Sequence, residues 1–266
     1  MTRLLPGLVM TVLWVMILVA GPTSLFWLLI VCMTVFGLLE YFKMTLNSPV
    51  SGSRLLVPVG IAALPVFVSI MNDPDLFIVS LFLSLFGSII FCLKAYARLG
   101  NPLHFLSLSS FGTLYIGFCL AHLVFIRHLP QGVAWLLVLT AVTAGSDTGA
   151  YYLGRTFGRR KLCPNLSPGK TVVGAVGGVV TGTLAAVLVG GALLPEFNPE
   201  FIAVTAFSLS LVSIIGDLVE SVVKRAAGVK DSGKVLFGHG GVLDRIDSML
   251  IAAPLLYYLV NVEVLL

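Results

Sequence analysis

The chain has 266 residues, of which 58% are hydrophobic and only 11% are charged, and its mean hydropathy is +1.05. Soluble domains are about one quarter charged, so this composition excludes an ordinary soluble globular protein. The formal net charge of +4 is less informative than the placement of the charges along the chain. The four cysteines form no Cys-x-x-Cys pair, so their spacing suggests neither a disulfide framework nor a cysteine metal site.

Long apolar runs predict an all-α polytopic membrane protein with about nine transmembrane helices. We expect these helices at residues 4–20, 25–42, 55–71, 76–93, 105–126, 132–153, 171–194, 201–223 and 248–262. Helices are expected because a backbone that faces lipid must satisfy its own hydrogen bonds. The first run could imitate a signal peptide, but Gly21-Pro22 makes a poor cleavage junction, and we expect a retained first helix.

The positions of the charged residues support this number of helices. With a cytoplasmic N-terminus, every Lys and Arg except Arg127 falls in a segment on the cytoplasmic side. On the opposite side, the charged residues are Arg127 and five acidic residues: Asp73, Asp75, Glu196, Glu200 and Glu263. Cytoplasmic loops of membrane proteins carry an excess of Lys and Arg. The pattern therefore predicts a cytoplasmic N-terminus and an external C-terminus.

The first four predicted helices, within residues 1–104, carry few ionisable groups. We expect this region to anchor the protein, and we consider a role in dimer formation or lipid access. Glu40 and Lys43, at the end of the second run, are interpreted as interfacial anchors. Catalytic chemistry is expected in residues 105–266, which include two cytoplasmic loops, 154–170 and 224–247.

The sixth predicted helix becomes polar toward its cytoplasmic end. Thr143, Asp147 and Tyr151 are four residues apart and therefore share one helix face. Asp147 lies about two turns before the loop, which is deep for a surface residue. We expect this carboxylate either to contribute to a binding site or to pair with a neighbouring helix.

The loop at residues 154–170 combines five basic residues with glycines, prolines and Ser167. Basic side chains and free backbone N–H groups are what a polyphosphate needs, although lipid headgroups are an alternative ligand. Gly169-Lys170-Thr171 resembles the end of a P-loop. We reject a P-loop because Pro164 stands where its first glycine is required and no strand is expected before it.

The seventh predicted helix carries a stripe of small residues at four-residue intervals: Gly174, Gly178, Gly182 and Ala186. Such a stripe lets the backbone of another helix approach closely. We therefore expect this helix to pack tightly against the sixth or the eighth.

Residues 215–247 carry the densest charge in the chain. In the eighth predicted helix, a polar stripe follows one face through Ser213, Asp217, Glu220 or Ser221, and Lys224. A second acidic pair, Asp244 and Asp247, stands where the ninth helix begins. A carboxylate near a helix start can also act as a cap, which is a reasonable alternative for Asp247 or Ser248 and less so for both Asp residues together with Arg245.

Three helices are thus expected to bring carboxylates (Asp147, Asp217 and Asp244 with Asp247) to one cytoplasmic level beside two basic loops. Magnesium takes a few carboxylate ligands and completes its shell with phosphate oxygens and water. The arrangement therefore suits metal-assisted chemistry on a nucleoside triphosphate at the membrane surface. Zinc is not expected, since His239 is the only nearby histidine and no cysteine accompanies it.

Three segments with fixed spacing carry a family resemblance: Ser221-Val-Val-Lys-Arg225, Lys230-Asp231-Ser-Gly233 and Gly238-His239-Gly240-Gly241-Val-Leu-Asp244-Arg245-Ile-Asp247. Together they resemble the signature of the phosphatidate cytidylyltransferases, also called CDP-diacylglycerol synthases. Asp147-Thr-Gly-Ala-Tyr151 and Ser167-Pro-Gly-Lys170-Thr171 resemble a second region of that family. The resemblance covers the C-terminal part of the chain, and the first four helices match only in hydropathy.

The resemblance implies a nucleotidyltransferase of phospholipid biosynthesis that converts CTP and phosphatidic acid to CDP-diacylglycerol and pyrophosphate. It implies catalytic roles for Asp217, Lys224, Arg225, Asp244 and Asp247. The metal would be held by Asp217 and Asp244, with Asp247 as a further candidate. The implied substrate-binding residues are Asp147, Ser167, Lys170, Ser221, Lys230, Asp231, His239, Gly240, Gly241 and Arg245.

The resemblance also implies magnesium as the cofactor, allows a potassium ion beside it, and implies a homodimer. It places the protein in a bacterial-type inner or plasma membrane, with the active site facing the cytoplasm, where CTP is available. No nucleic-acid partner is expected.

A related CTP-dependent transferase or kinase, acting on another lipid phosphate or a polyprenol, stays open because two positions depart from the family pattern. Phe237 stands where the family has proline, and Val172-Val173 stands where an aromatic residue and Glu or Gln follow Lys-Thr.

A third hypothesis is an ion-coupled transporter that uses Asp147 and Asp217 as an ion site. It is disfavoured because the sequence shows no internal repeat and because these acids flank basic loops on one side.

Overall fold

The computed structural model describes residues 4–46, 52–233 and 240–265. Packing divides the chain into two compact units. The first unit contains Met1–His128 and Ala226–Arg245, and the second contains Leu129–Arg225 and Ile246–Leu266. We expected a boundary near residue 104, whereas the helices up to His128 belong to the first packing unit. The functional division proposed from the sequence stays a prediction.

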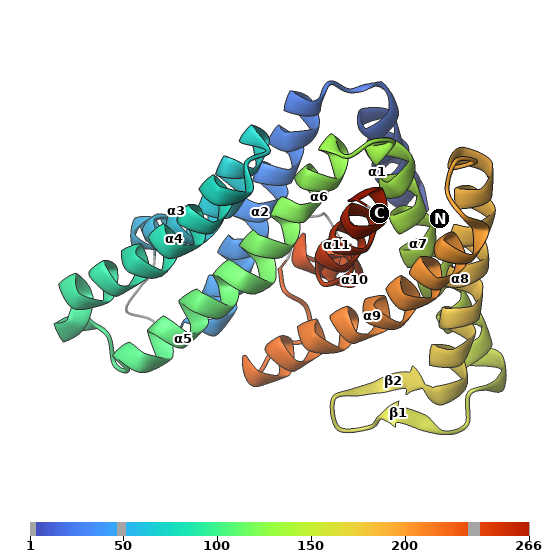
Figure 1. Ribbon diagram of the computed structural model, residues 1–266. Helices are drawn as coiled ribbons and strands as arrows, with labels where there is room; N and C mark the ends of the chain where they lie inside the picture. Colours follow the sequence, from blue (N-terminus) through green and yellow to red (C-terminus); the bar gives the residue numbers. More distant parts are fainter. Residues whose placement is uncertain (1–3, 47–51, 234–239, 266) are drawn as a thin grey trace. The chain divides into compact units, whose positions relative to one another are not determined.

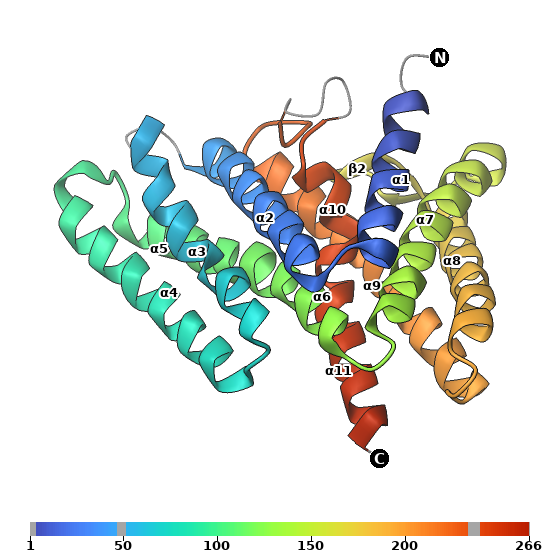
Figure 2. The same ribbon diagram turned by 90° about the horizontal axis from the view of Figure 1, so that it is seen from above.

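The first unit is helical throughout its described residues. Its α-helices are α1 (Leu4–Ala20), α2 (Thr23–Thr45), α3 (Leu56–Val68), α4 (Pro74–Ala95), α5 (Pro102–Gly112) and α6 (Cys119–His128). Short 3₁₀ segments flank α3 and follow α4, and a π-helical turn, Thr113–Phe118, connects α5 to α6. Figures 1 and 2 show α3 alongside α4, and α2 packs against both α3 and α6.

Two helix starts in this unit are encoded by short local motifs. The Asp73 carboxylate accepts hydrogen bonds from Asp75 N and Leu76 N at the start of α4, with Pro74 in the first turn. The Asn101 side chain accepts one from His104 N at the start of α5. Both residues satisfy N–H groups that have no partner within the helix, which is why Asp-Pro and Asn-Pro begin helices here.

The second unit contains α7 (Gly132–Phe157), β1 (Lys161–Cys163), β2 (Ser167–Thr171), α8 (Val172–Leu193), most of α9 (Pro199–Ala226), the later part of α10 (Leu243–Leu250) and α11 (Ala252–Leu265). Figure 1 shows α7 and α8 alongside each other, with the two strands at one end of this pair. The glycine stripe of α8 lies in this contact. A Cβ on Gly178 would lie 2.9 Å from Ser146 O, and one on Gly182 would lie 2.9 Å from Val142 O. The predicted close packing is confirmed.

Residues 161–171 form an antiparallel β-hairpin, which the sequence analysis did not predict. Lys161 pairs with Thr171 and Cys163 with Ser167. Leu166 N donates to Cys163 O at 3.1 Å, so Pro164 occupies the second position of a four-residue turn. Proline favours that position because its backbone φ is already suited to it. The basic segment expected as a loop is therefore the end of α7 followed by a hairpin.

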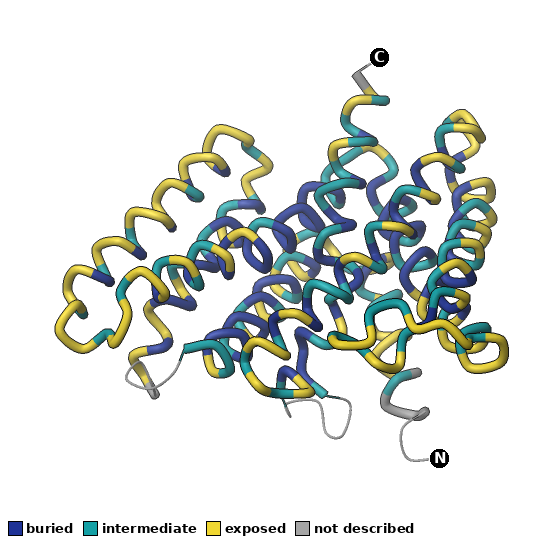
Figure 3. The backbone as a smooth tube through the Cα atoms, turned by 90° about the horizontal axis from the view of Figure 1, so that it is seen from below, coloured by how far each residue is buried: buried dark blue, intermediate teal, exposed yellow. Residues whose placement is uncertain are grey.

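The all-α membrane class is confirmed. Among the described residues, eight helices are long and apolar enough to cross a membrane, and the shorter apolar helix Val9–Ala20 precedes them. These segments coincide with the nine predicted runs, while the number that cross the bilayer and the orientation of the N-terminus stay predictions. Figure 3 shows α4 exposed along much of its length, and Phe82 and Phe86 are about two-thirds exposed. Such an apolar surface suits lipid contact.

Candidate functional site

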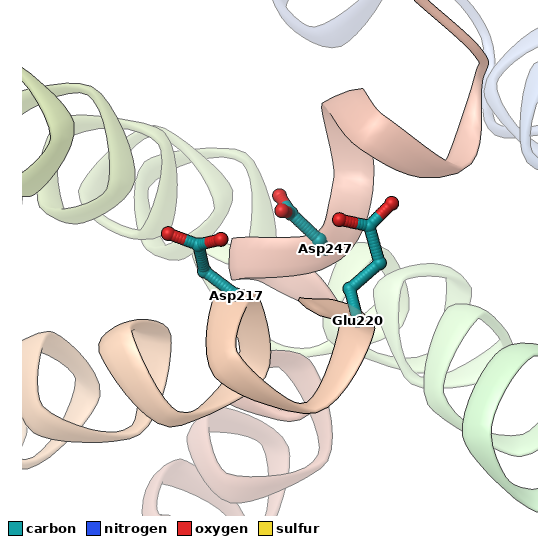
Figure 4. Close-up of side chains that lie close together, drawn as sticks. All are labelled: Asp217, Glu220 and Asp247. Carbon is teal, nitrogen blue, oxygen red and sulfur yellow. The ribbon is translucent and has the colours of Figure 1, made fainter. Parts of the chain in front are cut away.

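Three carboxylates form an acidic cluster in the second unit: Asp217 and Glu220 on α9 and Asp247 on α10. One oxygen from each lies within 4.8 Å of the others, and Figure 4 shows the three carboxylates side by side. Asp217 and Glu220 share one helix face because they are three residues apart. Three oxygen ligands from carboxylates form a donor set that suits a hard cation such as magnesium.

Gly216 permits the close approach of α9 and α10 that forms this acidic cluster. A Cβ at position 216 would lie 2.6 Å from Asp247 O, which is closer than real Cβ contacts. On the α10 side, the Asp247 carboxylate accepts hydrogen bonds from Ser248 N at 2.7 Å and Ser248 Oγ at 3.2 Å. Backbone contact and a neighbouring hydroxyl thus orient the carboxylate of Asp247.

Two lysines partly neutralise the acidic cluster. Lys170 Nζ, on β2, lies 2.5 Å from Asp217 Oδ2. Lys224, one turn after Glu220 on α9, forms an ion pair with the Glu220 carboxylate. Carboxylates this close repel one another, and nearby cations offset that repulsion. The structure supplies two such cations beside three acids.

An open cavity of about 610 Å³ lies beside Asp217 and is lined by residues of α7, the β-hairpin, α8 and α9. Its polar lining includes Asp147, Tyr151, Arg155, Lys161, Lys170, Thr171, Ser213 and Asp217. The volume is typical of pockets for small molecules and cofactors. We call this space the hairpin cavity. Its three cationic side chains, from α7 and both strands, can neutralise an anionic ligand.

Thr171 holds the hairpin against the helices around this cavity. It is the N-cap of α8, and its hydroxyl accepts a hydrogen bond from Gly174 N at 3.1 Å. Cβ atoms added at Gly154 or Gly174 would each lie 3.0 Å from this hydroxyl oxygen, and one at Gly158 would overlap it. The glycines at the end of α7 are therefore required by the close contact with Thr171.

The Asp244 carboxylate lies in the first unit and contacts the signature segment. Asp244 Oδ2 accepts hydrogen bonds from Gly241 N at 2.8 Å and from Ser232 N at 3.1 Å. The Ser232 hydroxyl lies 3.0 Å from the same oxygen. Gly240, beside this contact, has a φ of +81°, a conformation that favours glycine. The metal-binding role expected for Asp244 stays a prediction.

Glu40 was interpreted as an interfacial anchor, and this interpretation is wrong. Its side chain is buried, and its carboxylate accepts hydrogen bonds from Val242 N and Leu243 N, each at 3.0 Å. Sequence reasoning missed Glu40 because its partners lie about 200 residues further along the chain. It also treated Glu220 only as part of a polar stripe, although the three-residue spacing from Asp217 was a usable signal.

The structure places the remaining predicted residues at several positions. Asp147 is exposed and lines the hairpin cavity, Ser167 lies on β2, and Ser221 is buried in α9. Arg225 Nε donates to Leu166 O at 3.2 Å and so connects the end of α9 to the hairpin turn. Exposed side chains include Lys230, Asp231 and Arg245. His239 and the departing residue Phe237 lie outside the described residues.

Comparison with known proteins decides the family. The model of the cytidylyltransferase family matches residues 1–263 of this chain. The chain belongs to the cytidylyltransferase family. The match includes the first four helices, which the signature segments did not reach, and the resemblance inferred from those segments is confirmed.

Several curated members of the cytidylyltransferase family resemble this chain. The phosphatidate cytidylyltransferase of Bacillus subtilis (strain 168) is 45% identical over 148 residues, which are 55% of each chain. That of Brucella suis biovar 1 is 45% identical over 147 residues, 55% of this chain and 54% of the relative. The uncharacterized protein YnbB of Escherichia coli (strain K12) is 39% identical over 189 residues, 68% of this chain and 63% of the relative. The chain thus spans between half and two thirds of the length of these relatives.

Proposed function

We propose that this cytidylyltransferase-family protein is a phosphatidate cytidylyltransferase, which joins CTP to phosphatidic acid and forms CDP-diacylglycerol and pyrophosphate. The observation that carries the proposal is the hairpin cavity, in which Arg155, Lys161 and Lys170 stand beside Asp217 of the acidic cluster. The second unit thus places basic side chains, which can bind phosphates, next to carboxylates, which can bind a metal. Curated relatives with this printed name support the choice of substrates.

The reaction needs little acid–base chemistry from the protein. A phosphate oxygen of the lipid attacks the α-phosphorus of CTP, the bond between that phosphorus and the bridging oxygen to the β-phosphate breaks, and pyrophosphate leaves. A phosphate monoester has a second pKa of about 6, so the lipid phosphate is already an anionic nucleophile near neutral pH. Catalysis then consists of bringing two anions together and neutralising the charge on the α-phosphate and the leaving group.

The side chains of the cavity fit these tasks. Arg155, Lys161 and Lys170 line one space of about 610 Å³ and are proposed to hold the triphosphate. Lys170 pairs with Asp217, so its ammonium group stands between the acidic cluster and the cavity, where it can contact a phosphate oxygen. Asp147, exposed at the same cavity, is proposed to contact the nucleoside.

The acidic cluster is the proposed magnesium site. Asp217, Glu220 and Asp247 present the oxygen ligands that magnesium prefers, and their mutual proximity fits one cation. Magnesium, when bound there, would supply positive charge for the phosphates of CTP and of the pyrophosphate product. The family resemblance also assigns Asp244 to metal. It assigns Lys224 and Arg225 to nucleotide phosphates and Lys230 or Arg245 to the lipid phosphate. These roles, a potassium ion and a homodimer remain part of the proposal.

One assay tests the reaction. Full-length protein in detergent is supplied with CTP labelled on the cytosine, phosphatidic acid and magnesium, and lipid-extractable label and pyrophosphate are measured. We expect both products in equal amounts and a requirement for all three additions. Product with another lipid phosphate but none with phosphatidic acid would favour the related-transferase alternative. No dependence on CTP would contradict both readings.

A further inference from the structure

Glu40, near the end of α2, is a buried carboxylate that the reaction proposed above does not use. Its side chain is 5% exposed. Its two oxygens accept hydrogen bonds from Val242 N and Leu243 N, and Ser232 Oγ lies 3.1 Å from Oε2. All three partners belong to the signature segments of the family, and Glu40 belongs to the same compact unit as they do. One carboxylate from the N-terminal helices therefore contacts two described parts of the signature, Ser232 and Val242-Leu243, and we call residues 232–233 and 240–243 the signature loop.

Two glycines of the signature are required by the position of this carboxylate. A Cβ added at Gly233 would overlap Glu40 Oε1, and one added at Gly241 would overlap Glu40 Oε2. Glycine at these positions lets the backbone of the loop close around Glu40. The signature segment is thus shaped to receive a carboxylate from α2, in addition to any role in binding substrate.

Glu40 also accepts hydrogen bonds from backbone N–H groups at the start of α10. Leu243 is the first residue of that helix, and the first N–H groups of a helix have no partner within it. Because the carboxylate of Glu40 accepts hydrogen bonds from the N–H groups of Val242 and Leu243, it fixes where α10 begins. Asp244 and Arg245 lie in the first turn of α10, and Asp247 follows one turn later.

Ser232 connects Glu40 to Asp244. Its hydroxyl lies 3.1 Å from Glu40 Oε2 and 3.0 Å from Asp244 Oδ2, and its single proton can be donated to only one of them at a time. Asp244 Oδ2 is also held by the N–H groups of Ser232 and Gly241. The position of the Asp244 carboxylate therefore depends on the same loop that Glu40 holds.

We infer that Glu40 is a positioning residue for nucleotidyl transfer: it holds the signature loop and the start of α10, and through them Asp244 and Arg245, in the arrangement that the reaction needs. The inference rests on the proposed function. It also assigns a role in the reaction to the N-terminal helices, which the sequence analysis expected to serve mainly as an anchor.

The test compares Glu40→Gln with Lys43→Gln, a control on the same helix whose side chain is exposed. The glutamine keeps the size of Glu40 but replaces one acceptor oxygen by an NH₂ group that cannot accept from an N–H. A shift of about 1 Å in a reacting group can cost on the order of 10²-fold in rate. We expect kcat of Glu40→Gln to fall about 10- to 100-fold, with KM for CTP changed less than about threefold, because Glu40 is not among the residues that line the proposed nucleotide cavity.

Hydrogen exchange gives a second readout that does not need activity. Peptides covering residues 240–247 should exchange faster in Glu40→Gln than in the wild type, while peptides from α8 should not change. If the wild type makes no CDP-lipid, the proposed function fails, and the exchange result still shows whether Glu40 holds the loop. Should Glu40→Gln not insert into the membrane, Glu40→Asp, which keeps the charge and shortens the reach, is judged by the same criteria.

Unchanged kcat in either folded variant would overturn the inference. A fall in kcat would also overturn the inference if CTP affinity fell equally and hydrogen exchange became faster throughout the protein. That pattern indicates general destabilisation. A selective fall in kcat with local loosening of residues 240–247 would support it.

Discussion

Lys170 Nζ on β2 lies 2.5 Å from Asp217 Oδ2 on α9, and this ion pair joins the hairpin cavity to the acidic cluster. The two residues are 47 positions apart in the sequence; Lys170 lies in the second region of the family resemblance, and Asp217 precedes the signature segments. Their contact brings the cations that are proposed to hold the phosphates beside the carboxylates that are proposed to hold the metal.

Replacing Lys170 should weaken nucleotide binding. In Lys170→Ala the triphosphate loses a charged contact, and hydrogen bonds to charged groups contribute about 1.5–3 kcal/mol, which corresponds to roughly 10- to 100-fold in affinity. We expect KM for CTP to rise by about that factor. Arg159→Ala is the matched control, since Arg159 is exposed on the same segment and does not line the described part of the cavity. Equal effects of the two substitutions would contradict a specific role for Lys170.

Removing a carboxylate of the acidic cluster should abolish turnover and metal binding together. For Asp217→Asn, Glu220→Gln and Asp247→Asn, we expect the rise in melting temperature caused by magnesium to disappear. At a magnesium concentration of about 100 Kd, binding stabilises the wild type by about 2.7 kcal/mol. Glu200→Gln, an exposed residue in the first turn of α9, is the control and should respond like the wild type.

The same measurement on Asp244→Asn separates two assignments. If Asp244 binds the metal, as the family resemblance implies, the magnesium response should be lost in this variant too. If Asp244 only holds Ser232 and Gly241, the response should persist while turnover falls. A normal magnesium response in Glu220→Gln would remove Glu220 from the proposed ligand set.

Adding a methyl group between α7 and α8 should destabilise the second unit. A Cβ at Gly149 would overlap the Thr181 hydroxyl, so we expect Gly149→Ala to lose about 1–3 kcal/mol of stability, as overpacked sites do. Gly191→Ala on α8 is the control, because nothing lies within 4 Å of its added Cβ. Thermal unfolding in detergent measures both. A Gly149→Ala melting temperature equal to that of the control would show that the two helices are further apart than described.

Gly216→Ala should separate the two helices that form the acidic cluster. Its Cβ would lie 2.6 Å from Asp247 O, so α10 must move away from α9. A displacement of about 1 Å at a reacting centre costs on the order of 10²-fold in rate, and we expect a loss of that size in kcat. The magnesium response should weaken in parallel. Normal activity would mean that the distance between Asp217 and Asp247 does not matter for the reaction.

The sequence predicted the helices well because their signals are local. Eight of the described helices are long and apolar enough to cross a bilayer, and a single run of sequence reveals each of them. Caps such as Asp73 and Asn101 also act within three residues, although the sequence analysis did not use them. The hairpin at Lys161–Thr171 was missed because its strands are short and polar, without the alternation that identifies a strand. The glycine stripe of α8 was interpreted correctly because small residues four apart have one main use between membrane helices.

The candidate site was predicted in part. Asp217 came from the polar stripe of its helix and from the family resemblance, and Asp247 and Lys170 came from the resembling segments. The structure brings each of the three into the acidic cluster or its ion pairs. Glu220 and Glu40 were not selected. Glu220 lay on a predicted polar face without an identified partner, and Glu40 resembled the charged residues that commonly end a membrane helix.

The sequence by itself determined the membrane class, the approximate bounds of the helices and the family, because hydropathy, capping and motif spacing are properties of single segments. Tertiary structure decided which carboxylates meet, that Lys170 pairs with Asp217, and that Glu40 holds the start of α10. These contacts join residues tens to hundreds of positions apart. Whether a charged side chain faces solvent or a buried partner depends on the packing around it, and no local pattern specifies that packing.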